Sequence, residues 1–147
     1  MNFTSLSLSN ALLKDRAEKL RTLFNSDHTM RIFANDFIPT PASVLADFTE
    51  ASFTGYSPVP MLNKFKPPAK IKDGIYEIAA PGHVFLCTGG PPQTVYGVYL
   101  SNGIDVQMFE RFSKPIIMDR NSVFSVSFRP QLLSEYEFVQ SLEIPNI

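Results

Sequence analysis

The side chains best suited to chemistry in this sequence are two histidines and one cysteine, and their spacing argues against a reactive site. Neither His28 nor His83 has a neighbour at the spacing typical of zinc ligands. A single cysteine excludes an intrachain disulfide and any metal site built from several thiolates. Cys87 lies between Leu86 and Thr88, a setting that favours a small buried residue over a nucleophile. We therefore expect neither a metal nor a cofactor.

The acidic residues and the glycines of the sequence also do not indicate a catalytic site. Two acidic pairs, Asp47 with Glu50 and Asp105 with Glu110, are candidates for a general acid and a general base. Residues five apart in a strand point to opposite faces, however, which separates Asp105 from Glu110. The glycines of residues 89–92 (GGPP) lack the lysine and the hydroxyl side chain that hold phosphates in a P-loop. We therefore expect a protein that is not an enzyme.

Residues 57–72 are a basic stretch without acidic residues, and its prolines and length predict a long loop or an extended arm. Phe65 is the only aromatic residue in this stretch, so base stacking has little support. The net charge of the chain is -1, which removes the attraction expected of a nucleic-acid-binding protein. The alternatives are a solvated loop and a surface that docks on an acidic partner. The lysines of the stretch are Lys64, Lys66, Lys70 and Lys72.

The C-terminal stretch has the opposite charge. After Arg129 the sequence contains Glu135, Glu137 and Glu143 and no lysine or arginine. Opposite charges in two parts of one small chain favour self-association or docking on a partner. We therefore expect protein partners, and no nucleic acid.

An amphipathic helix is expected over residues 10–24, because apolar residues recur there at steps of four, three and four. A helix of this length is too short to be stable alone, so its apolar stripe must pack against something. Two interpretations stay open: the stripe closes one end of the remaining domain, or it contacts a neighbouring subunit. The candidate partner-binding residues are those of the stripe, Leu13, Leu20 and Phe24, and the lysines Lys64, Lys66, Lys70 and Lys72.

From residue 29 onward the apolar period changes to two and turn residues recur. This pattern is typical of an antiparallel β-sandwich or a jelly-roll-like barrel, here with about eight strands and one N-terminal α-helix. A chain of 147 residues is long enough for one ordinary domain. We therefore expect a helical arm over residues 1–28 and a β-sandwich domain over residues 29–147. The expected strands include residues 29–34, 52–57, 75–79, 83–88, 123–128 and 133–139.

The clearest hairpin is expected around Asn102 and Gly103, because this dipeptide suits a two-residue type I′ turn. Such a turn places Tyr99 opposite Val106 and Gly97 opposite Met108. No window reaches the roughly 18 apolar residues that a membrane-spanning helix needs. We therefore expect no membrane partner.

Two adjoining segments, residues 31–41 (RIFANDFIPTP) and 44–56 (VLADFTEASFTGY), resemble a group of small proteins encoded by tailed bacteriophages. Residues 95–100 (VYGVYL) and 110–112 (ERF) continue this resemblance, which covers residues 30–128 in scattered patches. Members of the group are virion components of the capsid cement or decoration type.

The resemblance implies a structural protein of the virion, assembled in the host cytoplasm, that stabilises the capsid by bridging neighbouring subunits. The implied partners are the major capsid protein and further copies of the chain, as a symmetric trimer or dimer. The alternative is a tail or head appendage that binds a host receptor or a glycan. Its motivation is a set of tyrosines near turns, which we expect to be exposed: Tyr56, Tyr96 and Tyr99.

Overall fold

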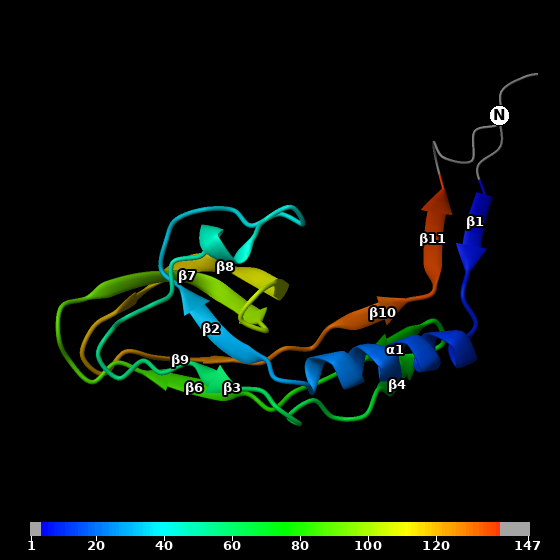
Figure 1. The fold of residues 1–147 in the computed structure, drawn as a ribbon, viewed down its shortest axis with the longest axis horizontal. Coiled ribbons are helices and arrows are strands. Elements are labelled where there is room, and N and C mark those ends of the chain that lie inside the picture. The colour runs from blue at the N-terminus through cyan, green and yellow to red at the C-terminus, as the bar shows by residue number, and fades with distance from the viewer. Residues whose placement is uncertain (1–3, 139–147) are drawn as a thin grey trace, which may run out of the picture. The chain divides into compact units, whose positions relative to one another are not determined.

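The computed structural model describes residues 4–138, which form one α-helix, a short 3-10 turn and antiparallel strands (Figure 1). The chain divides into two compact units. The helix unit comprises Met1–Leu23, Phe65–Ala80 and Phe128–Ile147, and the sheet unit comprises Phe24–Lys64 and Pro81–Ser127. Each unit is therefore assembled from stretches that are separate in the sequence.

Helix α1 (Asn10–Phe24) has the bounds expected from the apolar periodicity. The hydroxyl of Ser9 accepts a hydrogen bond from the amide of Leu12 (3.2 Å), which caps the first turn. The side chains of Leu13 and Phe24 are buried, and Leu20 is half-buried. The stripe is thus packed against protein, as its periodicity requires.

Hydrogen bonds tie both ends of α1 to the segment Phe65–Ala80. At the N-terminal end, Nδ2 of Asn10 donates to Oδ1 of Asp73 (3.1 Å), and Oδ1 of Asn10 accepts from the amide of Gly74 (2.8 Å). Near the C-terminal end, Nε of Arg21 donates to the carbonyl of Phe65 (3.0 Å). The observed grouping therefore differs from the expected helical arm over residues 1–28 and β domain over residues 29–147. These bonds connect residues more than forty positions apart, which no local pattern reveals.

The described residues of the helix unit form two small antiparallel sheets. One has the strand order β10-β5-β4, and the other pairs β1 with β11 (Figure 1). Gly74, in the turn between β4 and β5, has a φ of 81°, a left-handed conformation that favours glycine. The strands are β1 (Thr4–Ser7), β4 (Ala69–Lys72), β5 (Ile75–Glu77), β10 (Gln131–Leu133) and β11 (Glu135–Phe138).

The sheet unit contains a four-stranded sheet of order β3-β2-β7-β8 and a two-stranded sheet of β6 and β9. The rings of Phe112 and Phe124, one from each sheet, meet edge to face with centroids 5.6 Å apart. The elements are β2 (Thr29–Phe33), η1 (Leu45–Asp47), β3 (Val59–Pro60), β6 (His83–Leu86), β7 (Gln93–Ser101), β8 (Val106–Met118) and β9 (Val123–Val126).

Buried aromatic rings form the core beside the four-stranded sheet. The ring of Phe33 lies edge-on to Phe48 (5.3 Å between centroids), and Phe48 stacks on Tyr99 (4.5 Å). Gly97 makes room for this cluster, because a Cβ there would lie 2.4 Å from the Phe33 ring and 2.3 Å from the carbonyl oxygen of Glu110. Close packing therefore requires glycine at this position.

The expected fold class is confirmed: the protein is mainly β, with antiparallel sheets and one N-terminal helix. The described sheets keep open edges and do not close into a barrel, so the arrangement agrees with the sandwich alternative. Within residues 4–138, no helix has the length and apolar character needed to cross a bilayer.

Two local predictions of secondary structure are wrong. Residues 52–57, expected as a strand, contain only an isolated bridge between Thr54 and Gly89. Residues 57–72, expected as a loop or arm, contain β3 and the edge strand β4. Strand β4 pairs with β5 in a local hairpin, and this pairing overrides the low strand propensity of its lysines.

The expected hairpin is present, but its register is wrong in the prediction. Ser101 lies opposite Val106. The reason is the side chain of Asn102, whose Oδ1 accepts hydrogen bonds from the amides of Ile104 (2.9 Å) and Asp105 (2.7 Å). This Asx-type turn lengthens the loop to residues 102–105. A further register shift between Leu100 and Ser101 places Gly97 opposite Arg111, where Met108 was expected.

Candidate binding surfaces

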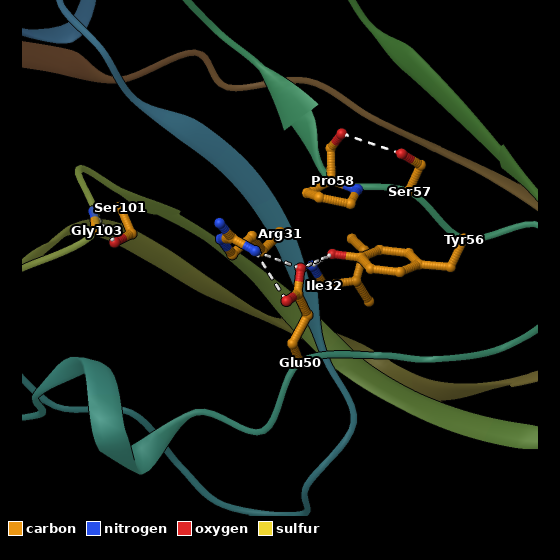
Figure 2. Close-up of polar contacts among 8 residues, drawn as sticks. All are labelled: Arg31, Ile32, Glu50, Tyr56, Ser57, Pro58, Ser101 and Gly103. Atoms are coloured by element: carbon orange, nitrogen blue, oxygen red, sulfur yellow. Dashed lines mark hydrogen bonds and ion pairs between the residues drawn. The ribbon is translucent and has the colours of Figure 1, made fainter.

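A polar cluster joins Arg31, Glu50 and Tyr56 in the sheet unit (Figure 2). Nη1 of Arg31 donates to both carboxylate oxygens of Glu50 (2.8 and 2.7 Å). The hydroxyl of Tyr56 donates to Oε2 of Glu50 (2.8 Å) and accepts from the amide of Ile32 (3.2 Å). Figure 2 shows the three side chains converging on one point beside β2. No local sequence pattern indicates the ion pair, because Arg31 and Glu50 are 19 residues apart.

The electrostatics of the cluster favour neutral tyrosines. Burial raises the pKa of Tyr56, and its hydrogen bond to Glu50 raises that pKa further. Burial, with the negative charge of Glu50, raises the pKa of Tyr99 to about 12. Both hydroxyls are therefore protonated at neutral pH, and the carboxylate of Glu50 is fully engaged. The cluster holds residues 50–56 against β2 and has no free acid or base.

The remaining candidates for chemistry are also engaged or isolated. Asp47 caps η1, since its Oδ2 accepts from the amide of Val44 (2.8 Å). His28 is 2 % exposed, with the hydroxyl of Ser26 3.2 Å from Nδ1. Sγ of the buried Cys87 donates to the carbonyl of Gly89 (3.3 Å). In the described part of the chain, no three His, Cys, Asp or Glu residues gather where they could hold a metal ion.

Two of the expected partner-binding residues, Leu13 and Leu20, lie together in a groove of the helix unit. The groove has a volume of about 470 Å³. Leu133 at its wall is 56 % exposed, so part of its apolar lining faces solvent. Phe24, the third expected residue of the stripe, is buried and is not part of this lining. The groove is lined by Leu8, Leu13, Arg16, Lys19, Leu20, Leu132 and Leu133.

The four expected lysines are exposed but do not form one site. Lys64 belongs to the sheet unit, whereas Lys66, Lys70 and Lys72 belong to the helix unit. Lys70 is paired with Asp73 (2.6 Å). This pairing raises the pKa of Lys70 and lowers the pKa of Asp73. The lysines of β4 thus lie on an exposed edge strand.

The sheet of β6 and β9 exposes an apolar face, here called the β6–β9 face, which comprises Val84, Leu86 and Val123. These side chains are 60 %, 46 % and 58 % exposed, and Leu86 lies directly opposite Val123 in the register. On the other face of the same sheet, Phe85 and Phe124 stack with centroids 5.3 Å apart. The small sheet is therefore apolar on both faces, and only one of them is covered. Both strands were expected from the sequence, over residues 83–88 and 123–128, but the apolar character of the exposed face was not.

The tyrosines expected to form an exposed aromatic surface are largely engaged. Tyr99 is 2 % exposed, so this expectation is wrong for Tyr99. Tyr56 is half-buried and stacks on Phe85 with centroids 5.9 Å apart. Tyr96 lies beneath the guanidinium of Arg111, 5.3 Å from the ring centroid.

No protein-family model, no curated protein and no solved structure matches this chain.

Proposed function

We propose that this chain is a structural virion protein of a tailed bacteriophage, a cement or decoration protein that bridges neighbouring capsid subunits. The observation that carries the proposal is that each compact unit has its own apolar surface. The helix unit has the groove beside α1, and the sheet unit has the β6–β9 face. A bridging protein needs at least two contact surfaces, and two modest contacts on one chain strengthen each other through effective concentration.

The partner proposed for the β6–β9 face is the major capsid protein. Three neighbouring side chains, each roughly half exposed, offer aliphatic area without charge. Such a patch fits the apolar centre of a protein interface better than a sugar or a nucleic acid, which need polar or cationic groups. The proposal places the chain in the virion, after assembly in the host cytoplasm, and gives it no catalytic role.

Mass spectrometry of purified virions tests the proposal directly. We expect the chain in many copies per particle, in a constant ratio to the major capsid protein. A tail or receptor-binding appendage predicts a few copies instead, and absence from the particle contradicts both functions.

Two variants test whether both surfaces are needed. Val84→Glu charges the β6–β9 face, and Leu133→Glu charges the groove; we expect each to lower the occupancy on particles at least tenfold and to abolish the gain in capsid thermal stability. Ile104→Glu is the matched control, because Ile104 is 79 % exposed in the loop between β7 and β8 and belongs to neither surface. Wild-type occupancy of the Val84 and Leu133 variants would falsify the bridging role.

A further inference from the structure

Strand β1 (Thr4–Ser7) has an open edge, because the sheet that it forms with β11 has no third strand among the described residues. We infer that this edge pairs with the same edge of a second copy of the chain. The product is a two-fold symmetric dimer with a continuous sheet of order β11-β1-β1-β11. The inference concerns the helix unit and stands independently of the proposed capsid role.

The register identifies the backbone groups that are free to pair. Strands β1 and β11 are antiparallel, and their ladder continues to Leu8, whose amide donates to the carbonyl of Ser134 (2.8 Å). Hydrogen-bonded pairs alternate with non-bonded pairs in an antiparallel ladder. Leu6 therefore also bonds toward β11, whereas the N–H and C=O groups of Ser5 and Ser7 point to the open edge.

The charge pattern favours the β1 edge over the β11 edge. Strand β1 reads TSLS, with no charge and no proline, whereas β11 reads EYEF. Antiparallel pairing of two β11 edges brings glutamates of both copies onto adjacent strands, where like charges repel. Pairing of two β1 edges joins neutral residues only, with Ser5 opposite Ser7 of the second copy. A two-fold axis through Leu6 satisfies the free groups of both copies at once.

The sheet of β10, β5 and β4 has an edge that is protected against pairing with another chain. Its edge strand β4 carries Lys70 and Lys72, and the pairing register shifts between them. Charged side chains and irregular register are the features that stop an edge from pairing with another chain. Strand β1 has neither feature in its pairing with β11.

The small size of the β1–β11 sheet adds a reason for pairing. An isolated two-stranded sheet is marginally stable in water, and sheets of three or more strands are substantially more stable. A second copy doubles the number of strands and supplies partners for the free N–H and C=O groups. Because each new strand has only four residues, we expect a weak dimer with a Kd of roughly 10 µM to 1 mM.

Sedimentation velocity of the full chain over this concentration range tests the inference, together with hydrogen exchange. We expect a monomer at low concentration and a dimer at high concentration. The amides of Ser5 and Ser7 gain protection with concentration, whereas the amides of Glu135 and Glu137 do not. A chain that stays monomeric throughout overturns the inference.

A matched pair of proline variants identifies the edge. Ser5 and Glu137 are opposite each other in the register, so Ser5→Pro removes an outward amide from β1 and Glu137→Pro removes one from β11. We expect Ser5→Pro to weaken the dimer at least tenfold and Glu137→Pro to leave it unchanged. The reverse result assigns the dimer to β11 and contradicts the inference.

A charge variant tests the same edge without proline, in case proline disrupts the β1–β11 sheet itself. In the double variant Ser5→Lys/Ser7→Lys, the lysines at positions 5 and 7 are opposite Glu137 and Glu135 of the same chain. The two lysines of one copy also lie opposite the two lysines of the second copy, where they repel. We expect loss of the dimer, with the Leu8 amide protected to the same extent as in the dilute wild-type monomer. Dimerisation equal to that of the wild type would show that β1 is not the interface.

Discussion

Residues 4–138 form two sheets of two strands each, β6–β9 and β1–β11, which differ in their surroundings. In the β6–β9 sheet, Phe85 and Phe124 form an inner face that packs against the rings of Tyr56 and Phe112. The β1–β11 sheet has no third strand in the part of the chain that the structure describes. Two strands therefore suffice in the β6–β9 sheet, where aromatic rings pack on one face, and we expect the β1–β11 sheet to gain stability from further strands. The first sheet offers a face to partners, and the second offers an edge.

The largest expected effect comes from removing the inner support of the β6–β9 sheet. Phe85 is 3 % exposed, and we expect Phe85→Ala to lower the free energy of unfolding by about 3 to 5 kcal/mol, through lost burial and a cavity. Val84→Ala, one residue away on the exposed face, is the control, with a change within about 0.5 kcal/mol. Urea denaturation measures both. Equal losses of unfolding free energy in the two variants would mean that the buried and the exposed face of this sheet contribute equally to stability.

Alkaline pH is expected to weaken the sheet unit next. The folded pKa of Tyr99 is about 12, above the value of about 10 for an unfolded tyrosine. Its contribution is therefore complete below pH of about 10 and is lost as the pH rises from about 10 to 12, on the order of 2 kcal/mol. Denaturant unfolding at successive pH values measures this loss. Tyr99→Phe should make the unfolding free energy fall less steeply with pH in this range. An unchanged pH dependence would mean that other groups cause the loss.

A smaller effect is expected at the anchor of α1 in the helix unit. Asn10→Ala removes the hydrogen bonds to Asp73 and to the amide of Gly74, and we expect a loss of about 1 kcal/mol. The control is Lys14→Ala on the exposed side of the same helix, with a change near zero. Thermal unfolding followed by circular dichroism compares the two variants. A larger loss for Lys14→Ala would contradict the role of Asn10.

The smallest free energy belongs to the opening of the β1–β11 sheet itself. In dilute solution we expect its amides to exchange with an opening free energy of about 0 to 1 kcal/mol. Amides of the β6–β9 sheet should exchange much more slowly, close to the rate of global unfolding. Hydrogen exchange read by mass spectrometry or NMR gives both values. Similar protection of the two sheets at low concentration would remove the contrast between them.

The local elements were largely predictable, and their partners were not. The bounds of α1 followed from apolar residues repeated every three or four positions, because one helix face must avoid water. The hairpin position followed from Asn102 and Gly103, but the register depended on hydrogen bonds of the Asn102 side chain. Of the candidate binding residues, Leu13 and Leu20 lie in one groove, whereas the lysines fall into both units.

The amino-acid sequence by itself determined the fold class, the helix and most strand positions, because each depends on the period of apolar residues along a short segment. Only the tertiary structure decided that α1 groups with residues 65–80 and 128–147, that Arg31 binds Glu50, and that Val84, Leu86 and Val123 form one exposed face. These features depend on pairings between residues far apart in the chain. Such pairings are selected by the packing of the whole unit, and no single segment carries that information.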